Sequence, residues 1–370
     1  MNDDNRTVHD EVGITDAVEK YFADKFNGAY VYQATNGPEY CRLYITLPNG
    51  AKPDCEKAEN DLSAIFDNRT VIVTPIEIYE ADLQVDVDRA NPVPYAFAEM
   101  LAALADEKEQ WQIPVAVGRD YKGAPIWQNI DRVIHMLVGG IQSRSDMYIQ
   151  SLLASVVALN TPDEVRIVIA DTTDGLYDLF DGAPHMLFGK ATNDESQAQA
   201  QLDWLRREID RRRQLFAQAK CSNIASYNDT VDDADKLYRI IVVADDAVYM
   251  SQAVQNSLIA IYANGRAAGV HVVIKTTGND MHRTRSALTD LPTRLVVQTR
   301  DRMVSQRMLQ RSGAERLRNF GDAFYKSIRY DYGIRVQFAI ASPKELEQVC
   351  LSAKNKYVSN FCKPVTPSDD

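Results

Sequence analysis

The stretch HMLVGGIQSRSDMYIQSLL, residues 135–153, decides how the larger part of this chain is read. An apolar segment runs into a glycine pair that ends at Gly140, and a polar turn and a helix-like run follow. A phosphate-binding P-loop begins in this way. It reads G-x-x-x-x-G-K-[ST], with amides around the phosphates, a lysine that neutralises them and a hydroxyl on magnesium. Counted from Gly140, the last three positions hold Ser145, Asp146 and Met147. The stretch thus begins like a nucleotide-binding loop, but it lacks the lysine and the hydroxyl that would bind phosphate and magnesium.

The composition indicates an ordinary soluble globular chain. Its 370 residues are 45% hydrophobic and 25% charged, which allows two domains. No apolar run approaches the length of a membrane span, the polar and acidic N-terminus is unlike a signal peptide, and the five cysteines are scattered. We therefore expect a cytoplasmic protein with reduced thiols, no membrane span and no metal site. The net charge of −11 argues against general coating of nucleic acid but leaves room for a local basic lining.

From residue 113 onward, strands alternate with helices. Five nearly continuous apolar strands are expected at residues 136–140, 165–171, 239–245, 270–276 and 293–299. Such strands are typical of a parallel sheet that is covered on both faces. In these sheets, ligands bind beyond the carboxyl ends of the strands. The pair Gly139–Gly140, Asp171, Asp245–Asp246 and Thr276–Thr277 all occur at those ends, so one crevice is expected there.

The chain divides into four parts on these patterns. They are a polar lead-in at residues 1–36, a small α/β domain at 37–108, a large core at 109–345, and a C-terminal segment with a tail at 346–370.

Several segments of the core resemble one family in order and spacing. These are IPVAVGRDYKGAPI (113–126), HMLVGG (135–140), CSNIASYN (221–228), GRAAGVHVVIKTT (265–277) and the run from LPTR (291–294) to Tyr325. Together they resemble the motor module of the FtsK/SpoIIIE family of DNA translocases. The resemblance implies a RecA-like P-loop NTPase core with a mainly parallel sheet, preceded by a small α/β accessory domain. It also implies assembly as a ring around duplex DNA.

The residues that the family uses for phosphate and magnesium are mostly replaced. The P-loop lysine falls on Asp146, the magnesium-binding hydroxyl on Met147 and the second glycine on Ser145. An aspartate in place of the lysine turns attraction for phosphate into repulsion, and a thioether cannot serve a cation that requires oxygen ligands. Hydrolysis by the usual route is therefore not expected. Taken alone, the stretch from Gly139 could be only a strand-to-helix turn.

Four further positions bear on the vestigial site. The Walker B pair falls on Asp245 and Asp246, the phosphate-sensing glutamine falls on Thr277, and Lys275 stands where the family has a small residue. Asp245 and Asp246 could still bind a metal ion, or they could simply be solvated loop residues at the end of a strand. Arg266 keeps its type and could lie at a subunit interface or on the free surface.

These features favour a pseudo-ATPase: a non-hydrolysing subunit, scaffold or DNA-binding component of a ring-type assembly. The expected partners are the chain itself or an active FtsK-like paralogue, with double-stranded DNA as the track and no cofactor. One alternative is a DNA-translocating ATPase with an unconventional site, which would need ATP and magnesium. The other is a protein-handling domain like those of type VII secretion ATPases.

Overall fold

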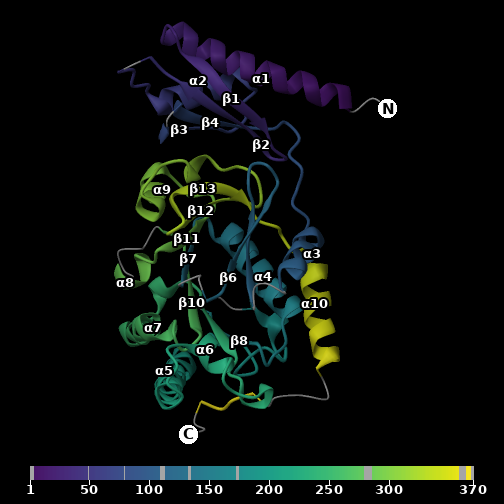
Figure 1. Ribbon diagram of the computed structural model, residues 1–370, viewed down its shortest axis with the longest axis vertical. Coiled ribbons are helices and arrows are strands. Elements are labelled where there is room, and N and C mark those ends of the chain that lie inside the picture. Colours follow the sequence, from purple (N-terminus) through teal and green to yellow (C-terminus); the bar gives the residue numbers. More distant parts are fainter. Residues whose placement is uncertain are drawn as a thin grey trace.

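The chain folds around two β-sheets in the computed structural model (Figure 1). The structure describes residues 4–48, 50–78, 80–108, 113–131, 135–171, 175–278, 286–357 and 364–367. Within them, the first sheet has four strands in the order β1-β2-β4-β3. The second has nine, in the order β6-β5-β13-β12-β11-β7-β10-β9-β8.

The first sheet is antiparallel and is packed against two helices. Its strands are β1 (Tyr30–Asn36), β2 (Tyr40–Thr46), β3 (Val71–Ile78) and β4 (Ala81–Asp88), and its helices are α1 (Asp4–Lys25) and α2 (Cys55–Ile65). Helix α2 begins where the Asp54 side chain accepts a hydrogen bond from the amide of Lys57. Residues that the sequence placed in the lead-in therefore supply a helix and the edge strand β1 to this small unit.

One end of the second sheet consists of the five strands that the sequence predicted. They are β11 (Thr293–Val296), β7 (Met136–Gly139), β10 (Val270–Thr276), β9 (Arg239–Ala244) and β8 (Val165–Ala170). All four pairings among them are parallel, as predicted, and each strand is buried along its whole length. Gly139 of β7 pairs with both Thr276 of β10 and Val296 of β11, so the carboxyl ends of these three neighbouring strands meet at one edge.

Four antiparallel strands extend this sheet beyond β11. They are β12 (Asp322–Ser327), β13 (Tyr330–Gln337), β5 (Pro114–Arg119) and β6 (Pro125–Asn129). The predicted parallel arrangement thus holds for the five strands that carry the expected crevice, and antiparallel strands complete the sheet.

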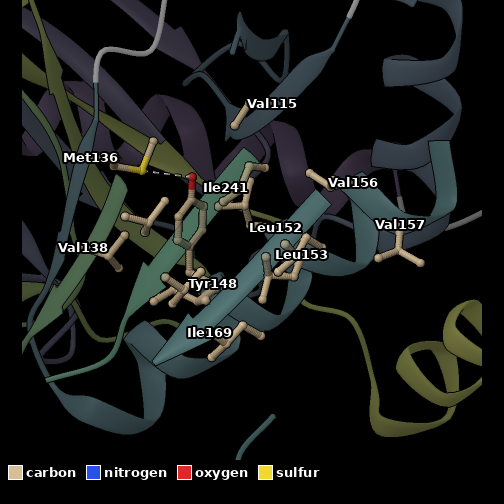
Figure 2. Close-up of a cluster of buried hydrophobic side chains, with 14 of the residues drawn as sticks. Val115, Met136, Val138, Tyr148, Leu152, Leu153, Val156, Val157, Ile169 and Ile241 are labelled. Carbon is tan, nitrogen blue, oxygen red and sulfur yellow. Dashed lines mark hydrogen bonds between the residues drawn. The ribbon is translucent and has the colours of Figure 1, made fainter. Parts of the chain in front are cut away.

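Helices cover both faces of the second sheet. The core of one face includes residues of α4 (Gln142–Leu159) and α10 (Pro343–Lys356), beside which α3 (Phe97–Glu107) packs. The core of the other includes α5 (Glu195–Gln218), α6 (Ile224–Asn228), α7 (Gln252–Gly265), α8 (Ser286–Thr289) and α9 (Arg302–Leu309). Figure 2 shows part of the first core, where Tyr148 of α4 donates a hydrogen bond to the sulfur of Met136 at 3.7 Å.

Among the described helices, none is long and apolar enough to cross a membrane.

Buried ion pairs join the two sheets. Arg335 of β13 is fully buried and contacts both Asp88 of β4, at 2.6 Å, and Asp322 of β12. Arg119 of β5 pairs with Glu39, which precedes β2, at 2.6 Å. A charge that is buried in this way must be compensated, so these contacts fix the small unit against the core.

Candidate functional site

The loop that should hold phosphates is reduced to two residues. Strand β7 ends at Gly139 and α4 begins at Gln142, with Ile141 as its N-cap. Gly140 has φ +125°, and a Cβ atom there would lie 2.6 Å from the carbonyl oxygen of Gln298. The positive φ and this close approach both require glycine. The predicted strand-to-helix turn is therefore confirmed, but the residues that would wrap a phosphate already belong to the helix.

The backbone amides of the turn bond within the protein. Gly140 donates to the carbonyl oxygen of Thr276 at 3.3 Å and Ile141 to that of Gln298 at 2.7 Å. Arg144 and Ser145 both donate to the carbonyl oxygen of Ile141 at 3.1 Å. A P-loop binds phosphate with amides that point into the loop. These four amides are directed to carbonyl groups of the fold.

A buried lysine lies between the two carboxylates that mark the site. The ammonium of Lys275 on β10 contacts Oδ1 of Asp146 on α4 and lies 2.6 Å from Oδ1 of Asp245, which follows β9. The side chains of Lys275 and Asp245 are 0% exposed and that of Asp146 is 14% exposed. Tyr177 donates its hydroxyl to the other oxygen of Asp245 at 2.9 Å. Position 146 carries a carboxylate, and the cation that faces Asp245 comes from β10.

The shifts in pKa show how this charge is shared. Burial raises the pKa of Asp146 and of Asp245, although Lys275 pulls both back toward the charged form. Burial alone would lower the pKa of Lys275, but Asp245 and Asp146 together raise it above its ordinary value. The ammonium is therefore charged, and it is shared by more carboxyl groups than it can neutralise.

Asp246 adds an unbalanced acid beside this cluster. It has φ +49°, precedes the short helix η3 (Ala247–Tyr249) and is 3% exposed, and its Oδ1 has no hydrogen-bond partner among the described residues. Burial, together with Asp245, Asp146 and Asp171, raises its pKa to about 6 against the opposing effect of Lys275. Asp171 follows β8 and is also buried.

The other expected nucleotide-site residues serve the fold. The hydroxyl of Ser145 donates to the carbonyl oxygen of Gln142 at 2.8 Å, and Met147 packs against the core beneath α4. Thr277 is half-buried just after β10. In the part of the chain that the structure describes, no group of three or more His, Cys, Asp or Glu side chains is arranged to hold a metal ion.

The crevice predicted from the sequence brings its residues together, and Arg266, which was expected at a subunit interface or on the free surface, lies apart from it. The vestigial positions lie at the carboxyl edge of the parallel strands. Arg266 lies at the opposite edge, because it ends α7 just before β10 begins at Val270. It is exposed, and its charge helps to lower the pKa of the buried His135, after burial and His271, to about 3. The sequence showed Lys275 as unusual but not its ion pairs, and nothing in it singled out Tyr177.

The strand order and the reduced loop define a RecA-like P-loop ATPase fold. The profile of the FtsK/SpoIIIE family matches residues 98–296, which is more than half of the chain. The chain belongs to the FtsK/SpoIIIE family.

Known proteins agree with this assignment. The chain is 27% identical over 341 residues to the DNA translocase FtsK of Caldanaerobacter subterraneus subsp. tengcongensis, covering 90% of this chain and 48% of that protein. It thus spans about half the length of the curated relatives it matches.

Two solved structures share the fold at low sequence identity. The pCW3 conjugation coupling protein TcpA, a monomer form with ATPgS, aligns with a TM-score of 0.58 and 14% identity, over 90% of this chain and 98% of that one. Thermomonospora curvata EccC (ATPases 2 and 3), in complex with a signal sequence peptide, aligns with a TM-score of 0.56 and 18% identity, over 80% and 52%.

Proposed function

We propose that this chain is an FtsK-like pseudo-ATPase, a non-hydrolysing subunit or scaffold of a ring-type assembly. The observation that carries the proposal is the position of Lys275, whose ammonium is buried between Asp146 and Asp245. Among the described residues, the lysine at the site is thus paired to protein carboxylates. Asp171 and Asp246 are buried beside this pair, and their charges add to those of Asp146 and Asp245.

This charge distribution opposes nucleotide binding. At about 4 Å, a unit charge and a phosphate charge interact by ~4 kcal/mol at an effective dielectric constant near 20. The P-loop lysine would supply that attraction, and an aspartate in its place supplies repulsion of similar size. Phosphoryl transfer depends almost wholly on positioning and charge neutralisation, so a site that lacks both would not hydrolyse ATP by the usual route.

The partners that we propose follow from family membership. The curated relatives are named DNA translocases, so double-stranded DNA and a second copy or an active FtsK-like paralogue are the expected partners. The chain would then contribute shape and contacts to the ring, and a neighbouring subunit would contribute the chemistry. Fluorescence anisotropy with labelled duplex DNA tests the first partner, and its salt dependence reports the number of phosphate contacts.

Nucleotide binding and turnover test the proposal directly. We expect no magnesium-dependent ATPase activity above background, with or without duplex DNA. We also expect no rise in melting temperature with millimolar magnesium–ATP, because a ligand that binds only the folded state must stabilise it. Turnover that disappears in Asp245→Ala or Asp246→Ala would instead establish the translocating ATPase with an unconventional site. A thermal shift that is lost in Lys275→Met would show that Lys275 leaves its carboxylates to bind phosphate.

Protein handling is a second candidate function. It is favoured by the fold shared with EccC, whose structure was solved with a signal sequence peptide. A chain that binds a partner protein but not duplex DNA at low salt would favour this candidate over the DNA-associated scaffold.

A further inference from the structure

A four-residue segment of the chain is seated on the surface of the core. Residues 364–367, with the sequence Pro-Val-Thr-Pro, follow the outer edge of the second sheet. The amide of Val365 donates to the carbonyl oxygen of Leu187 at 2.8 Å, and the amide of Leu187 donates to Ile167 of β8 at 2.9 Å. The segment thus continues the backbone hydrogen bonding outward from β8.

The side chains of the segment meet complementary groups on this surface. Val365 is half-buried and packs against the apolar core in which Leu187 lies. Pro364 faces Gly189, where an added Cβ atom would come within 3.2 Å of the proline ring. Arg207 of α5 donates to the carbonyl oxygen of Pro367 at 3.0 Å. The surface therefore offers a backbone acceptor, an apolar contact, space above a glycine and a charged donor.

The sequence of the segment suits binding in an extended form. Each proline has a fixed φ, and Thr366 is restricted to extended backbone because a proline follows it. Little conformational freedom is therefore lost when the segment docks. Val365 supplies the apolar contact, while Pro364 and Thr366 are exposed. A contact of this small size is reversible, as in the recognition of short proline-rich peptides.

We propose that residues 187–189 and Arg207 form a docking site for an extended Pro-Val-Thr-Pro segment, and that this segment of a second copy can replace the chain's own. The contacts are the same in both arrangements, as in domain swapping, so concentration decides between them. A tethered segment has an effective concentration on the order of millimolar. An isolated chain therefore holds its own segment, and closely spaced copies can exchange theirs. The exchange does not depend on the state of the nucleotide crevice.

Fluorescence anisotropy with a labelled, end-blocked PVTP peptide tests the docking site on the whole chain. Val365→Asp releases the chain's own segment, because a carboxylate does not pack against an apolar core. We expect the peptide to bind this variant at least about threefold more tightly than the wild type, whose site is already filled. A PDTP peptide is the matched control and should not bind. Equal affinity for variant and wild type, no binding to the variant at millimolar peptide, or equal binding of PDTP would overturn the proposal.

Two substitutions on α5 locate the peptide. In the Val365→Asp background, Arg207→Ala removes the donor to Pro367 and should weaken peptide binding about threefold or more. Arg206→Ala is the matched control, since Arg206 is also exposed but pairs with Asp203, and it should leave binding unchanged. Equal effects of the two substitutions would contradict the assignment.

Mixing two variants tests the exchange between copies. Val365→Asp keeps the docking site but loses the segment, whereas Arg207→Glu keeps the segment but weakens the site. In sedimentation velocity, the equimolar mixture should contain a pair that neither variant forms alone, and excess PVTP peptide should dissociate it. Self-association through ring faces would occur in each sample and would not respond to the peptide. A mixture that sediments as the sum of its parts would overturn the exchange.

Discussion

Replacing Lys275 by methionine tests how much its ion pairs with Asp146 and Asp245 stabilise the fold. The substitution keeps the length of the side chain but leaves Asp146 and Asp245 without a cation. At the 2.6 Å between Lys275 Nζ and Asp245 Oδ1, two unit charges attract by roughly 6 kcal/mol at an effective dielectric constant of about 20. That is an upper limit, because an orphaned carboxyl group can take up a proton.

Protonation of the orphaned carboxyl group sets the size of the loss in stability and makes that loss depend on pH. Each pKa unit is worth ~1.4 kcal/mol, so protonating a carboxyl group with an ordinary pKa near 4 costs ~4 kcal/mol at pH 7 and ~1.5 kcal/mol at pH 5. We therefore expect Lys275→Met to lower the free energy of unfolding by about 4 kcal/mol at pH 7 and by about 1.5 kcal/mol at pH 5. The first value agrees with the ~3–5 kcal/mol typical of removing one partner of a buried pair.

Urea denaturation of the wild type and the variant at both pH values measures these losses. Lys344→Met, on the exposed face of α10, is the matched control and should change stability by less than about 0.5 kcal/mol. A double-mutant cycle with Asp146→Leu should give a coupling energy of ~1–3 kcal/mol. A loss below ~1 kcal/mol at pH 7, or an equal loss at both pH values, would refute the reasoning.

Three further predictions concern other charged residues. Because the native pKa of Asp246 is raised to about 6, its contribution to stability is greatest below pH 4 and is lost as pH rises through 6. Asp246→Asn should therefore stabilise by ~3 kcal/mol at pH 7 and by little at pH 4, with exposed Asp210→Asn as the control in the same melts. Arg335→Met leaves Asp88 buried without its cation and should cost ~3–5 kcal/mol in urea denaturation, whereas an unchanged midpoint would show that the junction depends on other contacts. Arg266→Ala, at an exposed helix end, should leave the melting temperature unchanged but weaken self-association or a paralogue's turnover in ultracentrifugation and ATPase assays; unaltered assembly and turnover would remove it from the interface.

The parallel strands could be predicted because they are buried on both faces. VRIVIA in β8 and RIIVVA in β9 are apolar at almost every position, and the structure buries every residue of both. The edge strand β1 could not be predicted in this way. Its sequence, YVYQATN, is mostly exposed, so neither an alternating nor a continuous apolar pattern marks it. It forms because β2 offers it a partner, which is a tertiary contact.

In the candidate site too, some features could be predicted from the sequence and others depend on tertiary contacts. The positions of Gly140, Asp171 and Asp245 could be predicted, because parallel strands bring their carboxyl ends to one edge. The contact between Asp146 and Lys275 could not, because the residues are 129 positions apart and lie on a helix and a strand whose relative rotation depends on packing. A lysine in an otherwise apolar strand and an aspartate at a lysine position were each visible. Only the fold shows that they neutralise one another.

That pairing also predicts that Asp146 and Lys275 depend on one another for their charge balance. Without Lys275, Asp146 would be a fourth acid beside Asp171, Asp245 and Asp246 and would lack its cation. An unpaired charge in this buried site would cost several kcal/mol. Lys275 beside a lysine at position 146 would place two cations against Asp245. With both changes, one ammonium still faces Asp245, but it comes from β10 and no longer from the phosphate-binding turn. Asp245 thus still faces a cation, but the positive charge that a nucleotide phosphate would need is paired with protein carboxylates.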